Sequence, residues 1–436
     1  MLRSRRDGGV TVAAHMDVHT QDGAVAERSR ILFVATVDSH LYYFHLPFMR
    51  LLSEMGYEVE AAAGPSGFAS RIESAGFHVI PFAFTKNPVD PHQLAIVAQL
   101  TRLMRERRYV LVHVHTPIAG FVGRYAARRA GVPHIMYTAH GFHFHPLGRP
   151  AVNCLYTMIE KLASRWTDVL VVINSEDAAV ARALFSRPGL DIEYVPGVGV
   201  DTKVFAPVQP EVRRTSRERL GVAGAGLVVG WVGEFTRRKR PGDVLEVACH
   251  LAGSLPGTRF LMVGEGPLGS HTRQSARERG LDDTVLFPGW QGDVPSFLAA
   301  CDIVVSTASQ EGLPRNVLEA MACGLPVVAW NIRGCRDLVV DGETGFLPRY
   351  GDFEGMCSRL AQLAHDDVMR REMGSAGRER VLREFSLDRV IEDMRRIYDG
   401  QLGTGVGMDL PAQEVEPGIG HALSTRPEDA PAGVEQ

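Results

Sequence analysis

Short apolar runs alternate with amphipathic stretches along most of the chain. The stretches between the runs carry apolar residues at helical spacing, which predicts helices, one of them over 41–56. Strands that alternate with helices indicate a parallel sheet with helices on both faces. In the first half, six apolar runs read as buried strands: 31–37, 57–63, 77–84, 109–116, 134–141 and 169–175.

The pattern breaks at residues 195–210, which are rich in Gly, Pro and other turn residues, and then restarts. Five further runs read as strands: 227–233, 258–264, 284–289, 302–309 and 325–331. We therefore expect an α/β protein with two doubly wound, Rossmann-like domains facing each other across a cleft. The expected division is a disordered leader at 1–29, an N-terminal domain at 30–200, a linker at 201–225, a C-terminal domain at 226–385, a closing helix at 386–400 and a disordered acidic tail at 401–436.

Composition and charge are those of an ordinary globular protein. Of the 436 residues, 45% are hydrophobic and 22% are charged, and the formal net charge is -4. This net charge gives no electrostatic case for nucleic acid as a partner. Two basic stretches, 102–108 and 124–131, could meet an anionic membrane surface, although such runs are more often solvated helix faces.

The cysteines and the hydropathy indicate the cellular compartment in which the protein works. Six cysteines are scattered without any CxxC spacing, which fits a reducing cytoplasm better than a disulfide framework. No window approaches ~18 uninterrupted apolar residues, so we predict no transmembrane helix. The leader has arginines near its start but no apolar run after them, which excludes a secretory signal. The tail carries six Asp and Glu residues against one Arg, which favours disorder.

Two carboxylates, Glu311 and Glu319, stand eight positions apart across a predicted helix start. Pro314 suits the first helical position, and Gly324 suits the end of the helix. At ~1.5 Å per residue, Pro314 and Glu319 are roughly 7.5 Å apart along the helix axis. The free N–H groups of a helix N-terminus between the two carboxylates form a natural anion site. A phosphate in the middle with a hydroxyl-rich ring at each end is the outline of a nucleotide sugar.

Two loops of the second domain are further candidates for binding a nucleotide or its phosphates. The run 264–269 satisfies G-x-G-x-x-G after a strand, which is the fingerprint of dinucleotide binding. However, it does not follow the first strand of its domain, and Pro267 removes a backbone donor. We therefore favour a loop that approaches a mononucleotide. The turn 233–241 places four cations near the predicted anion site, where Lys or Arg could hold a diphosphate; an exposed basic loop is the alternative.

Five histidines lie close together in the sequence of the first domain. His113 and His115 alternate along a strand, and His140, His143 and His145 follow in the next strand and loop. The group could be a zinc site, but zinc needs three convergent ligands, and HExxH is absent. A role for His140 in ligand binding is favoured, because open α/β sheets bind ligands at the C-terminal ends of their strands.

The segment 311–347 resembles the signature of retaining family-4 glycosyltransferases of the GT-B fold. Residues 138–145 and 196–205 resemble the branch that builds bacterial capsule, O-antigen and exopolysaccharide chains. The resemblance extends over about residues 30–400. Lys239 matches the family lysine, but Glu234 stands where many relatives have Arg, and Asp337 stands where many have Glu.

The resemblance implies a role for each matching residue. Glu319 would accept hydrogen bonds from the ribose, and Glu311 would bind the donor sugar. The amides around Gly312 and Leu313, with Lys239, would stabilise the departing diphosphate. His140 would contact the donor sugar or the developing oxocarbenium ion from across the cleft. The full expected donor site comprises Gly233, Arg238, Lys239, Gly264, Gly266, Gly289, Gly312, Leu313, Val317 and Glu319, with Ser39, His40 and Tyr42 of the 38–45 loop on the acceptor side.

These roles imply a retaining, metal-independent glycosyltransferase without a cofactor. It would move a hexose or N-acetylhexosamine from a nucleotide sugar, expected to be UDP-linked, to a saccharide acceptor, expected to be lipid-linked. The expected location is the cytoplasm, peripheral to the inner face of the membrane, in surface polysaccharide biosynthesis. Two alternatives stay open: a UDP-sugar epimerase of the GT-B fold, and a non-catalytic protein that binds a nucleotide sugar.

Overall fold

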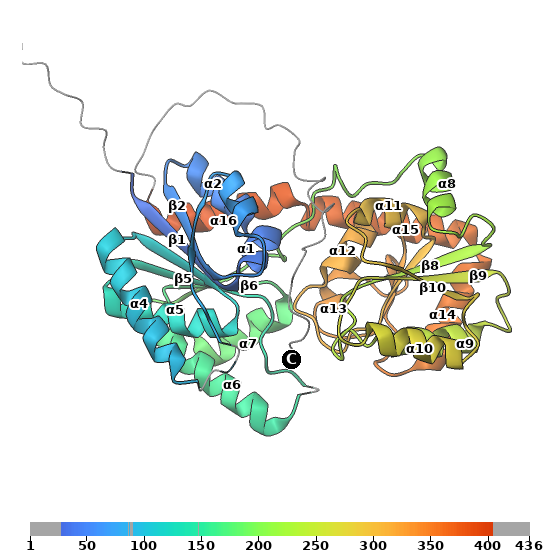
Figure 1. Ribbon diagram of the computed structural model, residues 1–436, viewed down its shortest axis with the longest axis horizontal. Coiled ribbons are helices and arrows are strands. Elements are labelled where there is room, and N and C mark those ends of the chain that lie inside the picture. Colours follow the sequence, from blue (N-terminus) through green and yellow to red (C-terminus); the bar gives the residue numbers. More distant parts are fainter. Residues whose placement is uncertain (1–27, 86, 88–89, 147, 404–436) are drawn as a thin grey trace, which may run out of the picture.

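The computed structural model describes residues 28–85, 87, 90–146 and 148–403. Of the expected leader at 1–29 and tail at 401–436, only residues 28–29 and 401–403 fall within these ranges, so the predicted disorder of both segments lies outside the described residues. Two α/β domains lie side by side, each built on one parallel sheet (Figure 1). The α/β class and the two doubly wound domains predicted from the sequence are confirmed.

The N-terminal sheet has seven strands in the order β3-β2-β1-β4-β5-β6-β7. Successive residues of β1 point to opposite faces, so Phe33 packs under α2 and α3, whereas Val34 packs under α4, α5 and α7. The elements are β1 (Arg30–Val37), α1 (Asp38–Phe44), α2 (Leu46–Glu54), β2 (Glu58–Gly64), α3 (Ala69–Ser74), β3 (His78–Pro81), α4 (His92–Arg107), β4 (Leu111–His115), α5 (Pro117–Ala130), β5 (His134–Ala139), α6 (Pro150–Ala163), a short 3-10 turn (Ser164–Trp166), β6 (Val169–Val172), α7 (Ser175–Phe185) and β7 (Asp191–Tyr194).

The C-terminal sheet has six strands in the order β10-β9-β8-β11-β12-β13. Its core holds the two large indoles of Trp231 and Trp330, both fully buried. The elements are α8 (Pro210–Arg219), β8 (Leu227–Val232), α9 (Pro241–Leu251), β9 (Thr258–Val263), α10 (Gly269–Glu278), β10 (Val285–Gly289), α11 (Val294–Ala300), β11 (Ile303–Ser306), α12 (Arg315–Ala322), β12 (Val327–Ala329), α13 (Cys335–Leu338), β13 (Gly345–Phe346), α14 (Phe353–His365), α15 (Asp367–Glu384) and α16 (Leu387–Leu402).

Several local features differ from the sequence prediction. The helix expected over 41–56 is two helices, α1 and α2, which meet at His45; Pro47 has no N–H and cannot continue a helix from the preceding turn. The segment 201–225, expected as a linker, contains α8, whose arginines bind Asp302 of the C-terminal domain. Strands β7 and β13 were not predicted, because β7 is short and partly exposed and β13 has only two residues.

The chain crosses between the domains twice, and the two crossings are hydrogen-bonded to each other. Val200 donates its N–H to the carbonyl of Phe385 (3.1 Å) and accepts from the N–H of Leu387 (2.9 Å). After the second crossing, α16 returns to the N-terminal domain and buries Met394 and Tyr398 in its core (red helix in Figure 1). The last helix therefore fixes one domain to the other.

Candidate active site

Two loops from different domains meet in backbone contact at His140–Gly141 and Gly312. A Cβ atom on Gly312 would lie 2.0 Å from the carbonyl oxygen of His140, and one on Gly141 would lie 2.8 Å from the Cα atom of Gly312. Gly141 also has φ +111°, a conformation that other residues rarely adopt. Both positions therefore require glycine. This contact places His140 of the N-terminal domain next to the Glu311 loop of the C-terminal domain.

An ionic cluster of Arg238, Lys239 and Glu311 lies directly before α12. The Nζ atom of Lys239 is 2.6 Å from Oε1 of Glu311, and Nη1 of Arg238 is 2.9 Å from Oε2. The Glu311 carboxylate is almost completely buried, whereas Arg238 is about half exposed. Burial raises the pKa of Glu311, but Lys239 and Arg238 together outweigh it, so the pKa lies below its usual value. Glu311 is therefore an anion held between two cations.

Helix α12 carries the second carboxylate of the predicted pair. Pro314 is the N-cap rather than the first helical residue, so the helix starts one position later than expected, at Arg315. Arg315 donates from Nε to Oε1 of Glu319 (2.7 Å) and from Nη1 to the carbonyl of Tyr43 in the other domain (2.8 Å). Burial raises the pKa of Glu319 against the opposing effect of Arg315. The two carboxylates thus sit in different electrostatic surroundings.

The glycines of the second domain bring three loops into backbone contact. A Cβ on Gly264 would lie 1.9 Å from the carbonyl oxygen of Gly233, and one on Gly266 would lie 2.7 Å from the N atom of Phe235. Gly264 also donates its N–H to the carbonyl of Gly289 (3.2 Å). The glycine run at 264–269 is therefore needed for packing between loops. Contact of these four glycines with a donor stays a prediction.

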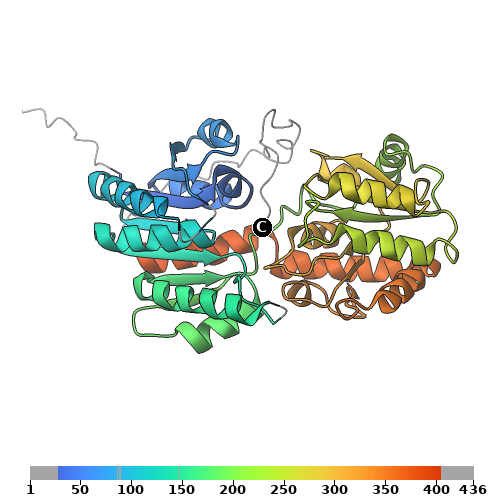
Figure 2. The ribbon, with the colours of Figure 1, turned by 60° about the horizontal axis from the view of Figure 1, so that its bottom comes forward.

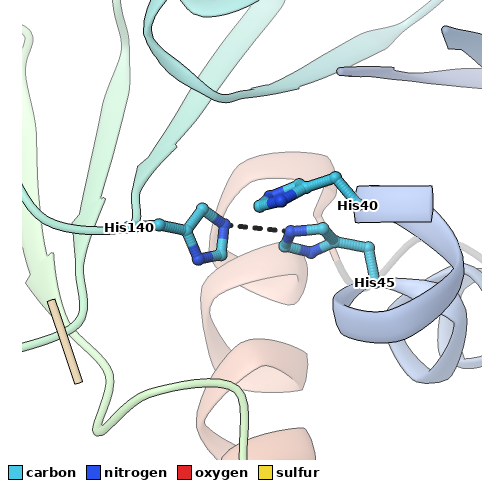
Figure 3. A group of neighbouring side chains, drawn as sticks. All are labelled: His40, His45 and His140. Carbon is cyan, nitrogen blue, oxygen red and sulfur yellow. Dashed lines mark hydrogen bonds between the residues drawn. The ribbon is translucent and has the colours of Figure 1, made fainter. Parts of the chain in front are cut away.

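A histidine cluster formed by His40, His45, His113, His115 and His140 lies on the N-terminal-domain side of the site. Figure 3 shows three of its members, His40, His45 and His140. The ring of His45 stacks on that of His115, with centroids 3.6 Å apart, and its Nε2 is 3.0 Å from Nε2 of His140. Burial lowers the pKa of all five, to about 4 for His40 and about 3 for His113. The rings are therefore neutral near pH 7.

The contact between His45 and His140 assigns their protons. Among the residues that the structure describes, no group hydrogen-bonds to the buried Nδ1 of His45. A proton on that nitrogen would be a buried donor without a partner, which is costly. The proton of His45 is thus assigned to Nε2, from which it is donated to Nε2 of His140. His140 then carries its own proton on Nδ1, which points away from His45 (Figure 3).

Three of these histidines could also act as metal ligands. One nitrogen from each of His40, His45 and His140 lies within 4.8 Å of the others. Neutral imidazoles are the usual zinc ligands. In the structure, two of these nitrogens face each other in a hydrogen bond rather than converging on a common point (Figure 3). Of the five histidines considered for zinc from the sequence, His140 belongs to this group, whereas His113, His115, His143 and His145 do not. His40 and His45 were not part of that prediction.

The domains are clamped together beside the site by Arg333. Its guanidinium pairs with Asp177 of α7 (2.7 Å) and donates to the carbonyl of Phe142 (2.8 Å) in the loop after His140. Asp337 accepts from the N–H of Ser175 (2.8 Å) across the same interface. The sequence predicted no role for Arg333 or Asp177, because no local pattern indicates a contact between residues that are 156 positions apart.

The other predicted residues are placed as follows. Val317, predicted as a donor-binding residue, has its side chain fully buried in the C-terminal core, so contact of this side chain with a donor stays a prediction. Tyr42 is buried against Phe68 in the N-terminal core, and its predicted place on the acceptor side stays a prediction. Ser39 and His40 are half-buried at the start of α1, which is a helix where a loop was expected. Leu313 packs against Gly197 of the first crossing.

Comparison with known proteins identifies the family. A model of glycosyl transferases group 1 matches residues 212–380, and a model of the glycosyl transferase 4-like domain matches residues 46–197. EpsD of Bacillus subtilis, whose name assigns it to the glycosyltransferases, is 36% identical over 86% of this chain and 97% of its own length. The chain belongs to the GT4 family of glycosyltransferases.

A second relative supports the family, and a solved structure supports the fold. The Escherichia coli UDP-Gal:alpha-D-GlcNAc-diphosphoundecaprenol alpha-1,3-galactosyltransferase is 30% identical over 69% of this chain and 77% of its own length. The crystal structure of HepE from Anabaena, in complex with UDP and glucose, superposes with a TM-score of 0.72 at 21% identity, covering 86% of this chain and all of HepE. The GT-B fold expected from the resemblance is thereby confirmed, and the GT4 enzyme uses a nucleotide sugar.

Proposed function

We propose that this GT4 enzyme transfers a hexose or N-acetylhexosamine from a UDP-sugar to a lipid-linked saccharide, with retention at the anomeric carbon. The observation that carries the proposal is the ionic cluster, held before α12 and in backbone contact with the His140 loop. Support for the nucleotide comes from HepE, which was crystallised with UDP, and from the UDP-Gal donor of the E. coli relative. That relative's diphosphoundecaprenol acceptor supports the lipid-linked acceptor.

The cation side of the site suits a departing diphosphate. Lys239 has three N–H donors, so it can hold Glu311 and a phosphate oxygen at the same time. Glu234, which replaces the arginine common in relatives, is exposed, whereas Arg238 stands beside Glu311. We propose that Arg238 supplies the second cation here. The amides of Gly312 and Leu313 would add two fixed dipoles to the same charge.

The neutral side of the site suits the sugar. The Nδ1–H of His140 would donate to a sugar oxygen, and its lack of charge avoids repelling a developing oxocarbenium ion. Glu311 would accept from the sugar hydroxyls, and Glu319 from those of the ribose. Ser39 and His40 would border the acceptor. In the overall reaction the acceptor oxygen replaces the diphosphate oxygen on the anomeric carbon, and the acceptor proton leaves with UDP.

The proposed place of action is the cytoplasmic face of the cell membrane, where a lipid-linked acceptor and a nucleotide sugar can meet. Among the helices of the described ranges, none combines the length and the hydropathy that a bilayer-spanning segment requires. The proposed role is in the synthesis of surface polysaccharide.

A panel of UDP-, GDP- and ADP-sugars, incubated with the purified protein and no acceptor, tests the proposal. We expect slow release of UDP and free sugar from one UDP-sugar, with the α or β configuration of the donor kept in the product. An epimerase would instead convert the donor into a second nucleotide sugar, which chromatography separates. A non-catalytic binding protein would retain the donor unchanged, and either result would overturn the proposal.

A further inference from the structure

Helix α6 exposes a stripe of apolar side chains on the outside of the N-terminal domain. The helix lies at the outer surface of this domain (Figures 1 and 2), and within its bounds only Glu160 and Ala163 are buried. The spacing of three and four positions puts the apolar residues on one side of the helix. The stripe consists of Val152, Leu155, Met158 and Leu162, which are 40%, 49%, 58% and 42% exposed.

The exposed charges on α6 and directly beyond its ends have one sign. Glu160, the single carboxylate of α6, points inward and pairs with the buried Arg124 of α5 (2.9 Å). The exposed charges on the helix and next to its ends are the cations Arg149, Lys161 and Arg165. An apolar stripe flanked by cations matches an anionic lipid surface, because apolar side chains enter the acyl boundary while Lys and Arg reach the headgroups.

The basic stretches considered in the sequence carry this role less well. Arg102 pairs with Glu106 (2.7 Å), and Arg107 pairs with the buried Glu60 (3.3 Å). Arg124, from the second stretch, is buried against Glu160. Neither stretch presents an apolar stripe comparable to that of α6 within the described residues.

The helix is also tied to the active site. Asn153 of α6 donates to the carbonyl of His145 (2.8 Å) and accepts from its N–H (3.3 Å). His145 lies five positions after His140, and Arg333 holds the carbonyls of the intervening loop. An acceptor whose lipid is anchored next to α6 would therefore present its saccharide close to His140.

We propose that α6 is a membrane-docking helix that lies in the headgroup region of an anionic bilayer and brings the His140 loop to the lipid-linked acceptor. This inference rests on the proposed function for its acceptor, but docking itself does not depend on catalysis. The occupant is a lipid surface rather than a second protein, because the flanking charges are all cations and a self-complementary interface would place them opposite each other.

Co-sedimentation of the full chain with vesicles tests the docking. We expect binding to vesicles made of equal parts of phosphatidylcholine and phosphatidylglycerol and little binding to phosphatidylcholine alone. The double substitution Leu155→Asp/Met158→Asp should lower the partition coefficient at least about 10-fold, since it removes two apolar side chains from the stripe. The matched control is Val368→Asp/Leu382→Asp, which adds the same charges at exposed apolar positions of α15 and should bind like the wild type.

A second variant and a second readout make the test independent of folding and of catalysis. Lys161→Glu/Arg165→Glu should weaken binding to the anionic vesicles while leaving the stripe intact. UDP affinity and the release of UDP from the donor should be the same in all variants as in the wild type. If the wild type itself neither binds UDP nor releases it from a donor, the proposed function is refuted but the docking is not. Undiminished vesicle binding by Leu155→Asp/Met158→Asp would overturn the docking proposal, as would a wild-type dimer that this variant dissociates without any lipid binding.

Discussion

The two walls of the candidate active site differ in charge. The C-terminal wall consists of a buried carboxylate between two cations, and the pKa of Glu311 lies below its usual value despite burial. The N-terminal wall consists of the histidine cluster, whose pKa values are lowered by burial, so it is polar but uncharged near pH 7. In glycosyl transfer, negative charge grows on the leaving diphosphate and positive charge on the sugar. Under the proposed function, cations on one side and neutral donors on the other would satisfy both requirements.

Removing the cation of the C-terminal wall should give the largest effect. Lys239→Ala should lower kcat by about 10²–10³, like the loss of one strong transition-state donor. Steady-state kinetics with the UDP-sugar identified in the panel measures this. Arg237→Ala is the matched control, since Arg237 is an exposed cation of the same loop. Unchanged turnover in Lys239→Ala would show that Lys239 does not stabilise the departing diphosphate.

Glu319 offers a test of binding rather than of catalysis. Glu319→Ala should weaken the binding of UDP about 10-fold or more, because the ribose would lose hydrogen bonds to a carboxylate. The value of kcat at saturating donor should change little. Titration calorimetry with UDP gives the affinity. The exposed Glu379→Ala on α15 serves as the control. If Glu319→Ala binds UDP as tightly as the wild type, its ribose role is wrong.

The neutrality of the N-terminal wall makes the fold sensitive to acid. The pKa of the buried His113 is lowered from 6.5 to about 3. Between these two pH values, His113 binds a proton in the unfolded chain but not in the folded chain. Stability from this residue is therefore complete above pH 6.5 and declines as the pH falls toward 3, by up to about 1.4 kcal/mol per pH unit. Urea unfolding at a series of pH values measures this slope. His113→Gln should make it shallower, unlike the exposed His271→Gln.

The sequence predicted the C-terminal wall better than the N-terminal wall. Glu311, Lys239 and Arg238 lie in loops directly after predicted strands, so the rule that ligands bind at the C-terminal ends of parallel strands was enough to group them. The contact of His45 with His140 joins positions 95 apart on different elements, and no local pattern encodes it. The burial of Tyr42 and Val317 depends on side-chain packing that periodicity does not resolve.

The hydrogen bond that sets the proton of His140 can be broken without adding charge. His45→Phe keeps a ring of similar size but removes the donor, and we expect kcat to fall about 10-fold with UDP affinity unchanged. His45→Gln, whose amide can replace the donor, should recover part of the loss. Separate measurement of kcat and of UDP binding distinguishes this from general destabilisation. Equal activities for the Phe and Gln variants would contradict the assigned proton positions.

The smallest effect is expected from removing metal ions. Tetrahedral zinc with bonds of ~2.0–2.1 Å places neighbouring ligand nitrogens roughly 3.3 Å apart, with both lone pairs directed at the ion. The nitrogens of His45 and His140 are 3.0 Å apart and face each other, so a hydrogen bond satisfies them as they stand. After dialysis against a chelator, turnover should therefore stay within about twofold of the untreated enzyme, since in the proposed site Lys239, Arg238 and the helix dipole of α12 would take the place of a divalent ion at the diphosphate. The opposite result would be one zinc per chain by elemental analysis, with loss of both the metal and the activity in His40→Ala. The N-terminal wall would then be a positively charged metal centre, and it would no longer be the uncharged wall of the site.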